Sequence, residues 1–153
     1  MGTVNEIVSG GQTGVDRAAL DVALELDISC GGWCPQDRKA EDGAIPDRYP
    51  LRETPYKNYN IRTEWNVRDS DATLILNLGS LEGGTARTAE IARQLRRPCL
   101  VIDLESNPDP AEVREWLRQY KIRKLNIAGP RESKWPGIQK SAAAFLRLVL
   151  ASS

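Results

Sequence analysis

Short apolar runs alternate with longer amphipathic stretches along most of this chain. Short runs of this kind are typical of buried strands, and stretches with an apolar residue every three or four positions are typical of helices. The pattern predicts strands at residues 6–9, 28–33, 72–78, 99–104 and 124–129. It predicts helices at residues 15–26, 60–69, 85–97, 109–120 and 136–151. Such alternation indicates a parallel sheet with helices on both faces.

The order of these elements predicts an α/β fold, a three-layer Rossmann-like sandwich around a five-stranded, mainly parallel sheet. Right-handed crossovers favour the strand order 2-1-3-4-5, counted along the chain. This order places the first and third strands side by side, where the winding of the sheet reverses. Ligands of open α/β sheets bind there, beyond the carboxyl ends of the strands. A ligand site is therefore expected between the ends of these two strands.

One long stretch lacks the alternation. Residues from about 34 to 60 are polar and contain four prolines. They predict a long loop insert in a single ligand-binding domain that spans residues 1–153. A loop this long inside a compact domain is usually functional or partly disordered. The aromatic and basic side chains of this insert can cover a flat ring, or they can pack on the body of the protein or on a second subunit.

Two glycine-rich turns each connect a predicted strand to a predicted helix, namely Ser9-Gly-Gly-Gln-Thr-Gly14 and Leu78-Gly-Ser-Leu-Glu-Gly-Gly-Thr85. Glycine lacks the Cβ atom that would block a phosphate from backbone N–H groups at a helix N-terminus. Both turns can also be tight structural turns. The candidate ligand-binding residues in and after them are Gly10, Gly11, Gln12, Thr13, Gly14, Arg17, Gly79, Ser80, Gly83, Gly84 and Thr85.

Several common kinds of site are not supported. The first turn has no Lys-Ser or Lys-Thr after its last glycine and lacks the Gly-x-Gly-x-x-Gly spacing, which argues against ATP hydrolysis and dinucleotide dehydrogenation. The chain has no histidine, so catalytic mechanisms that need one are excluded. Its 3 cysteines lack the second ligand pair of a zinc site and are expected to be reduced. No protein-held metal site is predicted, although the adjacent Glu41 and Asp42 suggest that Mg²⁺ could bind.

Charge and hydropathy restrict the partners. The 21 basic and 21 acidic residues balance, so no overall field attracts nucleic acid or an anionic membrane. No apolar stretch approaches the roughly 18 residues of a membrane span, and the first residues lack the features of a secretory signal. A cytoplasmic protein with a small ligand is expected.

Longer motifs resemble a known family. They are Ser9-Gly-Gly-Gln-Thr-Gly-Val-Asp-Arg17, Gly32-Trp-Cys-Pro35, Ala40-Glu-Asp-Gly43, Ile45-Pro-Asp-Arg-Tyr-Pro50, Asn77-Leu-Gly79 and Gly83-Gly-Thr85. Over nearly the whole chain these motifs resemble the bacterial putative molybdenum carrier family. That family is related to the lysine-decarboxylase-like proteins of Rossmann-like fold, which include nucleoside phosphoribohydrolases and an algal carrier of molybdenum cofactor. The resemblance implies a carrier of a molybdopterin-type cofactor.

The phosphoribohydrolases use an arginine and the glutamate of a Pro-Gly-Gly-x-Gly-Thr-x-x-Glu motif. By resemblance, Arg62 corresponds to the arginine and is a candidate for ligand contact or catalysis. The glutamate does not transfer, because Thr88 stands three residues after Thr85. Glu64 and Glu90 are the remaining candidates for a catalytic carboxyl group.

Two functions therefore stay open. The first is a carrier that holds molybdenum cofactor or a similar phosphorylated heterocycle. The second is a nucleoside monophosphate phosphoribohydrolase or a nucleotide sensor. In either case a homo-oligomer is expected, because relatives commonly dimerise and Trp116, Tyr120 and Trp135 are candidates for an interface.

Overall fold

A five-stranded parallel sheet forms the centre of the computed structural model, which describes residues 4–151. Every pairing between neighbouring strands of this sheet is parallel. The strands are β1 (Glu6–Val8), β2 (Ser29–Gly31), β7 (Ala72–Asn77), β8 (Cys99–Asp103) and β9 (Lys124–Ala128). The predicted fold class is confirmed.

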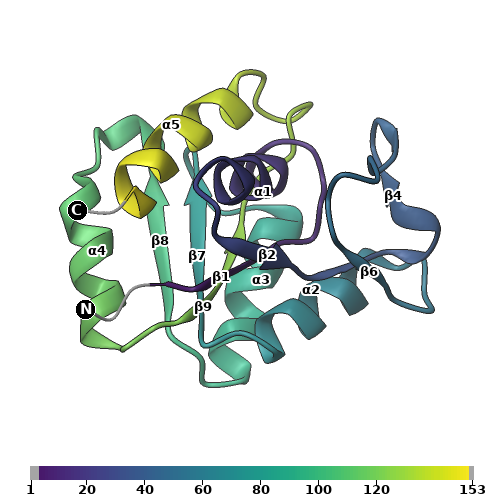
Figure 1. Cartoon of the computed structure of the whole chain (residues 1–153), viewed down its shortest axis with the longest axis horizontal. Helices are drawn as coiled ribbons and strands as arrows, with labels where there is room; N and C mark the ends of the chain where they lie inside the picture. Colours follow the sequence, from purple (N-terminus) through teal and green to yellow (C-terminus); the bar gives the residue numbers. More distant parts are fainter. Residues whose placement is uncertain (1–3, 152–153) are drawn as a thin grey trace.

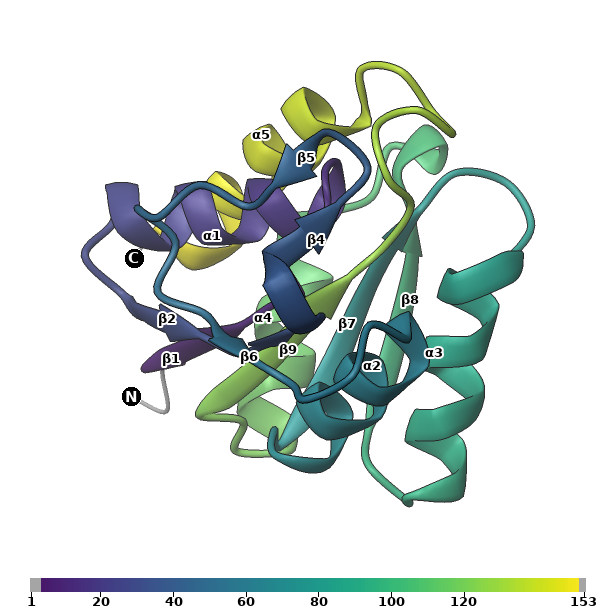
Figure 2. The same ribbon diagram turned by 90° about the vertical axis from the view of Figure 1, so that its right-hand side faces the viewer.

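Helices cover both faces of the sheet and complete the three layers. Figures 1 and 2 show α1 (Val15–Glu25) and α5 (Ile138–Leu150) on one side, and α2 (Tyr59–Arg68) and α3 (Gly83–Gln94) on the other. On the first side, α4 (Pro110–Gln119) joins α1 and α5 in the largest apolar core. Asp109 caps α4 by accepting a hydrogen bond from the Ala111 amide, as a residue before a proline-initiated helix commonly does.

The observed strand order differs from the predicted one. The sheet runs β2-β1-β9-β7-β8, so the last strand of the chain lies between β1 and β7. The predicted order 2-1-3-4-5 is therefore wrong as counted along this chain. A chain that began at β7, continued through β8 and β9, and ended with β1 and β2 would have the predicted order in this same sheet. The winding consequently reverses between β7 and β9, and the expected ligand site moves to the loops that follow these two strands.

The insert between β2 and α2 is tied to the body of the protein. It contains two small sheets, β3 (Trp33–Cys34) with β6 (Arg52–Glu53) and β4 (Lys39–Ala40) with β5 (Gly43–Ala44). Arg38, in the short 3₁₀ turn η1 (Gln36–Arg38), donates hydrogen bonds of 2.8–3.2 Å to four main-chain carbonyl groups of residues 45–51. Buried side chains from the insert also pack on Leu20 of α1.

Across residues 4–151, no helix combines the length and the apolar character that crossing a bilayer requires.

The junction after β9 leaves no room for a side chain, and this gives a test of the observed order. A Cβ atom on Gly129 would lie 2.3 Å from the Leu76 carbonyl oxygen of β7 and 2.6 Å from Val15 Cγ2. We expect Gly129→Ala to lower the free energy of unfolding by about 1–3 kcal/mol or more, as overpacked cores do. Urea denaturation measures this change.

Gly84→Ala is the matched control, because a Cβ atom there meets no other atom within 4 Å. Alanine favours the helix over glycine by up to about 1 kcal/mol, so this variant should be as stable as the wild type or more stable. Equal stability of the two variants would contradict the close packing of β9 against β7.

Candidate functional site

A cleft of about 330 Å³ opens beyond the carboxyl ends of β7 and β9. It therefore lies where the winding of the sheet reverses, which is the usual ligand position in open α/β folds. Four segments line it: the first glycine-rich turn with the start of α1, the start of α2, the start of α3, and the loop between β9 and α5.

The second glycine-rich turn faces this cleft. Gly83, Gly84 and Thr85 form the first turn of α3 and line the cleft. A Cβ atom on Gly83 or Gly84 would meet no protein atom within 4 Å, so these backbone groups border open space. No side chain caps this helix end. The start of α3 can therefore receive an anion on its backbone N–H groups.

The other two candidates of this turn lie outside the cleft lining. Gly79 and Ser80 are exposed. The Gly79 carbonyl accepts a 3.0 Å hydrogen bond from the Asn77 side-chain amide. This contact fixes the turn as the chain leaves β7.

The first glycine-rich turn is packed against protein instead. A Cβ atom on Gly10 would lie 1.7 Å from Arg62 Nη1, and one on Gly14 would lie 2.3 Å from the Pro130 carbonyl oxygen. One on Gly11 would lie 2.5 Å from the Leu51 side chain. Gly14 is required because the backbone of the loop after β9 approaches it closely, whereas Gly10 and Gly11 face the ends of side chains. From this turn, Gln12 lines the main cleft and Gly10 lines a small recess below it.

An ion pair between the buried Asp16 and the largely buried Arg62 forms the floor of the cleft. Arg62 Nη1 lies 3.1 Å from Asp16 Oδ2, which also accepts a 3.2 Å hydrogen bond from the Gln12 amide. Burial raises the pKa of Asp16 above its ordinary value, although Arg62 acts in the opposite direction. Arg62 Nε is buried without a hydrogen-bond partner among the described residues. The recess beside this pair has a volume of about 10 Å³, enough for at most one water molecule.

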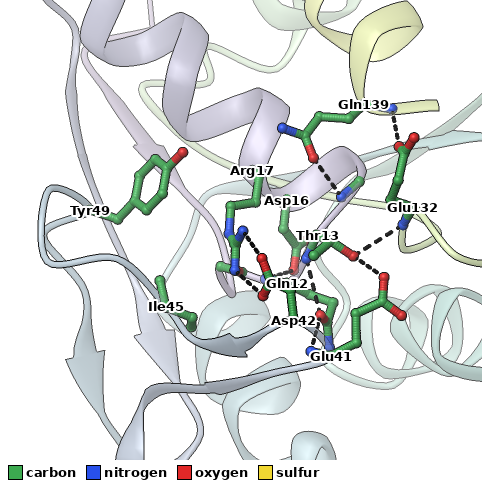
Figure 3. A network of polar contacts seen from close by, with 12 residues as sticks. Gln12, Thr13, Asp16, Arg17, Glu41, Asp42, Ile45, Tyr49, Glu132 and Gln139 are labelled. Atoms are coloured by element: carbon green, nitrogen blue, oxygen red, sulfur yellow. Dashed lines mark hydrogen bonds and ion pairs between the residues drawn. The ribbon is translucent and has the colours of Figure 1, made fainter. Parts of the chain in front are cut away.

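Arg17 does not reach the cleft. Figure 3 shows its guanidinium group turned toward Asp42, with Nη1 and Nη2 at 2.7 and 2.8 Å from the two carboxylate oxygens. Its Nε donates to the Gly11 carbonyl at 3.0 Å. The hydrogen bonds from Arg17 lower the pKa of Asp42. Arg17 thus anchors the hairpin β4–β5 to the first turn.

Thr13 also holds neighbouring segments together. Its hydroxyl donates to Glu41 and accepts a 3.1 Å hydrogen bond from the Glu132 amide (Figure 3). Glu41 further accepts a hydrogen bond from the Ser133 hydroxyl. Burial acts to raise the pKa of Glu41, but the hydrogen bonds from Ser133 and Thr13 outweigh it and lower that pKa. The hairpin β4–β5 is thereby tied to the loop between β9 and α5.

These contacts bear on the suggested Mg²⁺ ligands. The carboxylates of Glu41 and Asp42 are directed to different protein partners. Within residues 4–151, no three His, Cys, Asp or Glu side chains gather as a metal site would require.

Two cations of the cleft were missed by reasoning from sequence. Arg131 and Lys134 line it from the loop between β9 and α5. Lys134 Nζ lies 2.8 Å from the carboxylate of Glu82, the residue before α3, and Arg131 Nε lies 3.5 Å from that of Glu41. The sequence offered no motif for these residues, and the predicted strand order kept their loop away from the switch point.

The predicted catalytic carboxylates do not join the cleft. Glu64 and Glu90 are exposed and lie outside its lining, and Glu90 pairs with Arg87. Thr88 does line the cleft, and its hydroxyl donates to the Gly84 carbonyl at 2.9 Å. Asp16 is therefore the carboxyl group at the cleft floor.

Comparisons with known proteins agree with this fold. A model of the Circularly permutated YpsA SLOG family matches residues 7–150. A crystal structure from Syntrophus aciditrophicus SB, described as a putative molybdenum carrier protein, is 45% identical with a TM-score of 0.92, and the match covers 97% of this chain and 96% of that chain. No curated protein matches the chain.

The floor pair gives a prediction on stability. Arg62→Met leaves the Asp16 carboxylate buried without its counter-charge, which costs about 3–5 kcal/mol at neutral pH. The pKa of Asp16 should then rise further. The loss in free energy of unfolding should be complete above the pKa that Asp16 has in this variant. It should shrink as the pH falls and Asp16 binds a proton. Urea denaturation at neutral and mildly acidic pH measures both effects.

The double variant Arg62→Met with Asp16→Asn should regain much of the stability, because no charge stays buried. Arg87→Met, at an exposed ion pair, is the control for loss of an arginine. A loss in Arg62→Met that does not depend on pH would show that packing, rather than charge, is the cause.

Proposed function

The chain belongs to the Circularly permutated YpsA SLOG family, and on that basis we propose that it is a carrier or binding protein for a small phosphorylated heterocycle. A molybdopterin-type molybdenum cofactor is the first candidate ligand. Support for it comes from the similarity to the protein named a putative molybdenum carrier.

One observation carries the proposal: the open start of α3 in the cleft. Gly83 and Gly84 leave their backbone accessible, and the helix N-terminus has no side-chain cap. The positive end of the helix dipole favours an anion there. A ligand phosphate on these amides would also compete with Glu82 for Lys134.

The start of α2 suits the ring of such a ligand. Tyr59 is half-buried and lines the cleft next to Asn60 and Thr63. The Arg62 guanidinium carbon lies 5.6 Å from the centre of its ring. An aromatic face of this kind can stack on a flat heterocycle while neighbouring polar groups bind its edge. Any Mg²⁺ would arrive with a ligand pyrophosphate.

The second candidate is a hydrolase of nucleotide N-glycosidic bonds, and one observation favours it. Asp16 and Arg62 lie together at the cleft floor, and burial raises the pKa of Asp16. Perturbed acids in clefts are frequent in active sites, and an acid must be within reach of the proton that it transfers. A nucleotide sensor would use the same cleft without turnover.

The first experiment identifies the ligand. Native purification followed by mass spectrometry and elemental analysis for molybdenum tests for a pterin compound. A pterin with molybdenum would support the carrier. Release of free base from a panel of nucleoside monophosphates, lost in Asp16→Asn, would replace the carrier with the hydrolase.

Gly84→Asp tests the phosphate position. The new carboxylate would occupy the start of α3 and repel a phosphate, so affinity for the purified ligand should fall about tenfold or more, a loss of at least about 1.4 kcal/mol. The melting temperature should stay or rise, because an acidic residue in the first turn favours the helix. Calorimetric titration and thermal unfolding measure the two effects.

Gly84→Asn is the matched control, because its side chain has nearly the same shape without the charge. It should bind the ligand better than Gly84→Asp does. Unchanged affinity in both variants would exclude the start of α3 as the phosphate site.

A further inference from the structure

The strand β8 forms one edge of the five-stranded sheet. The main-chain groups that it leaves unpaired are arranged symmetrically about Val101. The Thr73 amide donates to the Pro98 carbonyl, and Thr73 is in register with Cys99. In a parallel ladder the residues of one strand bond alternately to either side. Leu100 and Ile102 therefore direct their main-chain groups to β7. Cys99, Val101 and Asp103 direct theirs away from the sheet.

Pro98 precedes β8 and the charged Asp103 ends it, but the residues between them carry no charge, proline or bulge. Sheets of monomeric proteins commonly carry charged residues, proline or a bulge on an edge strand. The first four residues of β8 are Cys99-Leu-Val-Ile102, paired with β7 in an unbroken register. Val101 is 42% exposed, although it lies in the middle of the strand. Leu95, at the end of α3, is 40% exposed.

The charges at the two ends of β8 are opposite. Arg96 and Arg97 precede the strand, whereas Asp103 ends it and Glu105 follows in η2 (Leu104–Ser106). No ion pair engages these four residues within the described part of the chain. An antiparallel copy of the strand would place each basic end beside an acidic end. A parallel copy would place like charges together.

We propose that β8 pairs antiparallel with β8 of a second copy of this chain, with the two-fold axis at Val101. The outward groups of Val101 would bond to those of Val101 in the second copy. Cys99 would face Asp103 in the same way, and the Asp103 carbonyl, which accepts from Ser106 Oγ, has a second lone pair for this bond. The two sheets would then form one continuous sheet.

This arrangement keeps both ligand clefts open. The carboxyl ends of the strands point in opposite directions in the two copies, so the clefts lie at opposite ends of the joined sheet. The interface also differs from the one expected around Trp116, Tyr120 and Trp135. Trp116 and Tyr120 pack edge to face on α4, and Trp135 lies in the loop between β9 and α5.

A cysteine at the axis tests the register. Opposite residues in a hydrogen-bonded antiparallel pair have Cα atoms about 5.5 Å apart, within the range of a disulfide. Val101→Cys in a Cys99→Ser background should therefore form a covalent dimer on mild oxidation. Wild-type Cys99 is the control, because two copies of it would be on the order of 13 Å apart, too far to be linked.

Sedimentation velocity tests the interface itself. The wild type should show a concentration-dependent dimer, and Val101→Lys should be monomeric because two lysines would meet at the axis. Val101→Thr, a β-branched control, should still dimerise. Circular dichroism and ligand affinity should be unchanged in Val101→Lys, since Val101 is exposed and is not among the residues that line the cleft.

A monomeric wild type at every concentration would overturn the proposal. So would a Val101→Lys protein that still dimerises, because another surface would then hold the copies together. A dimer in which Val101→Cys fails to crosslink would overturn the register. None of these results depends on the identity of the ligand.

Discussion

The buried contact between Asp16 and Arg62 joins the segments on which the candidate site depends. Asp16 belongs to α1 and accepts a hydrogen bond from the Gln12 amide of the first glycine-rich turn. Its partner Arg62 belongs to α2. The guanidinium group packs directly against Gly10, where a Cβ atom would overlap it. A buried carboxylate is costly unless it is paired with an opposite charge, which the largely buried Arg62 supplies here. This pair of charges consequently links the first turn and α1 to α2 at the cleft floor, beside the contacts that Arg17 and Thr13 make.

The two glycine-rich turns look alike in sequence but have different surroundings. Gly14 lets the loop after β9 approach, whereas Gly84 borders the open cleft. A glycine motif alone does not distinguish close approach of the protein from close approach of a ligand, because both need the same missing Cβ atom. This explains why the sequence placed both turns in the site. The structure lines the main cleft with Gln12 from the first turn and with Glu82, Gly83, Gly84 and Thr85 from the second.

Apolar periodicity was sufficient to predict the strands of the central sheet and the helices around it, but not the two small sheets of the insert. The predicted strand at 72–78 is observed as Ala72–Asn77, and the predicted helix at 109–120 as Pro110–Gln119. The order of the strands in the sheet could not be predicted in the same way. The rules for crossovers are satisfied equally well when the chain starts at a different strand of the same sheet. Arg62 was identified through resemblance. Arg131 and Lys134 were missed because their loop follows β9. This strand was predicted at the edge of the sheet but lies at its centre, beside the cleft.

The central position of β9 also has a consequence for how the protein is made on the ribosome. Both β1 and β7 pair with β9, and they do not pair with each other. During synthesis, the strands that come first therefore have no partner to join them into one sheet until residues 124–128 emerge. Such non-local pairing is slow to form and leaves unpaired strand edges exposed in the meantime. The nascent chain should need protection from aggregation until residues 124–128 have been translated.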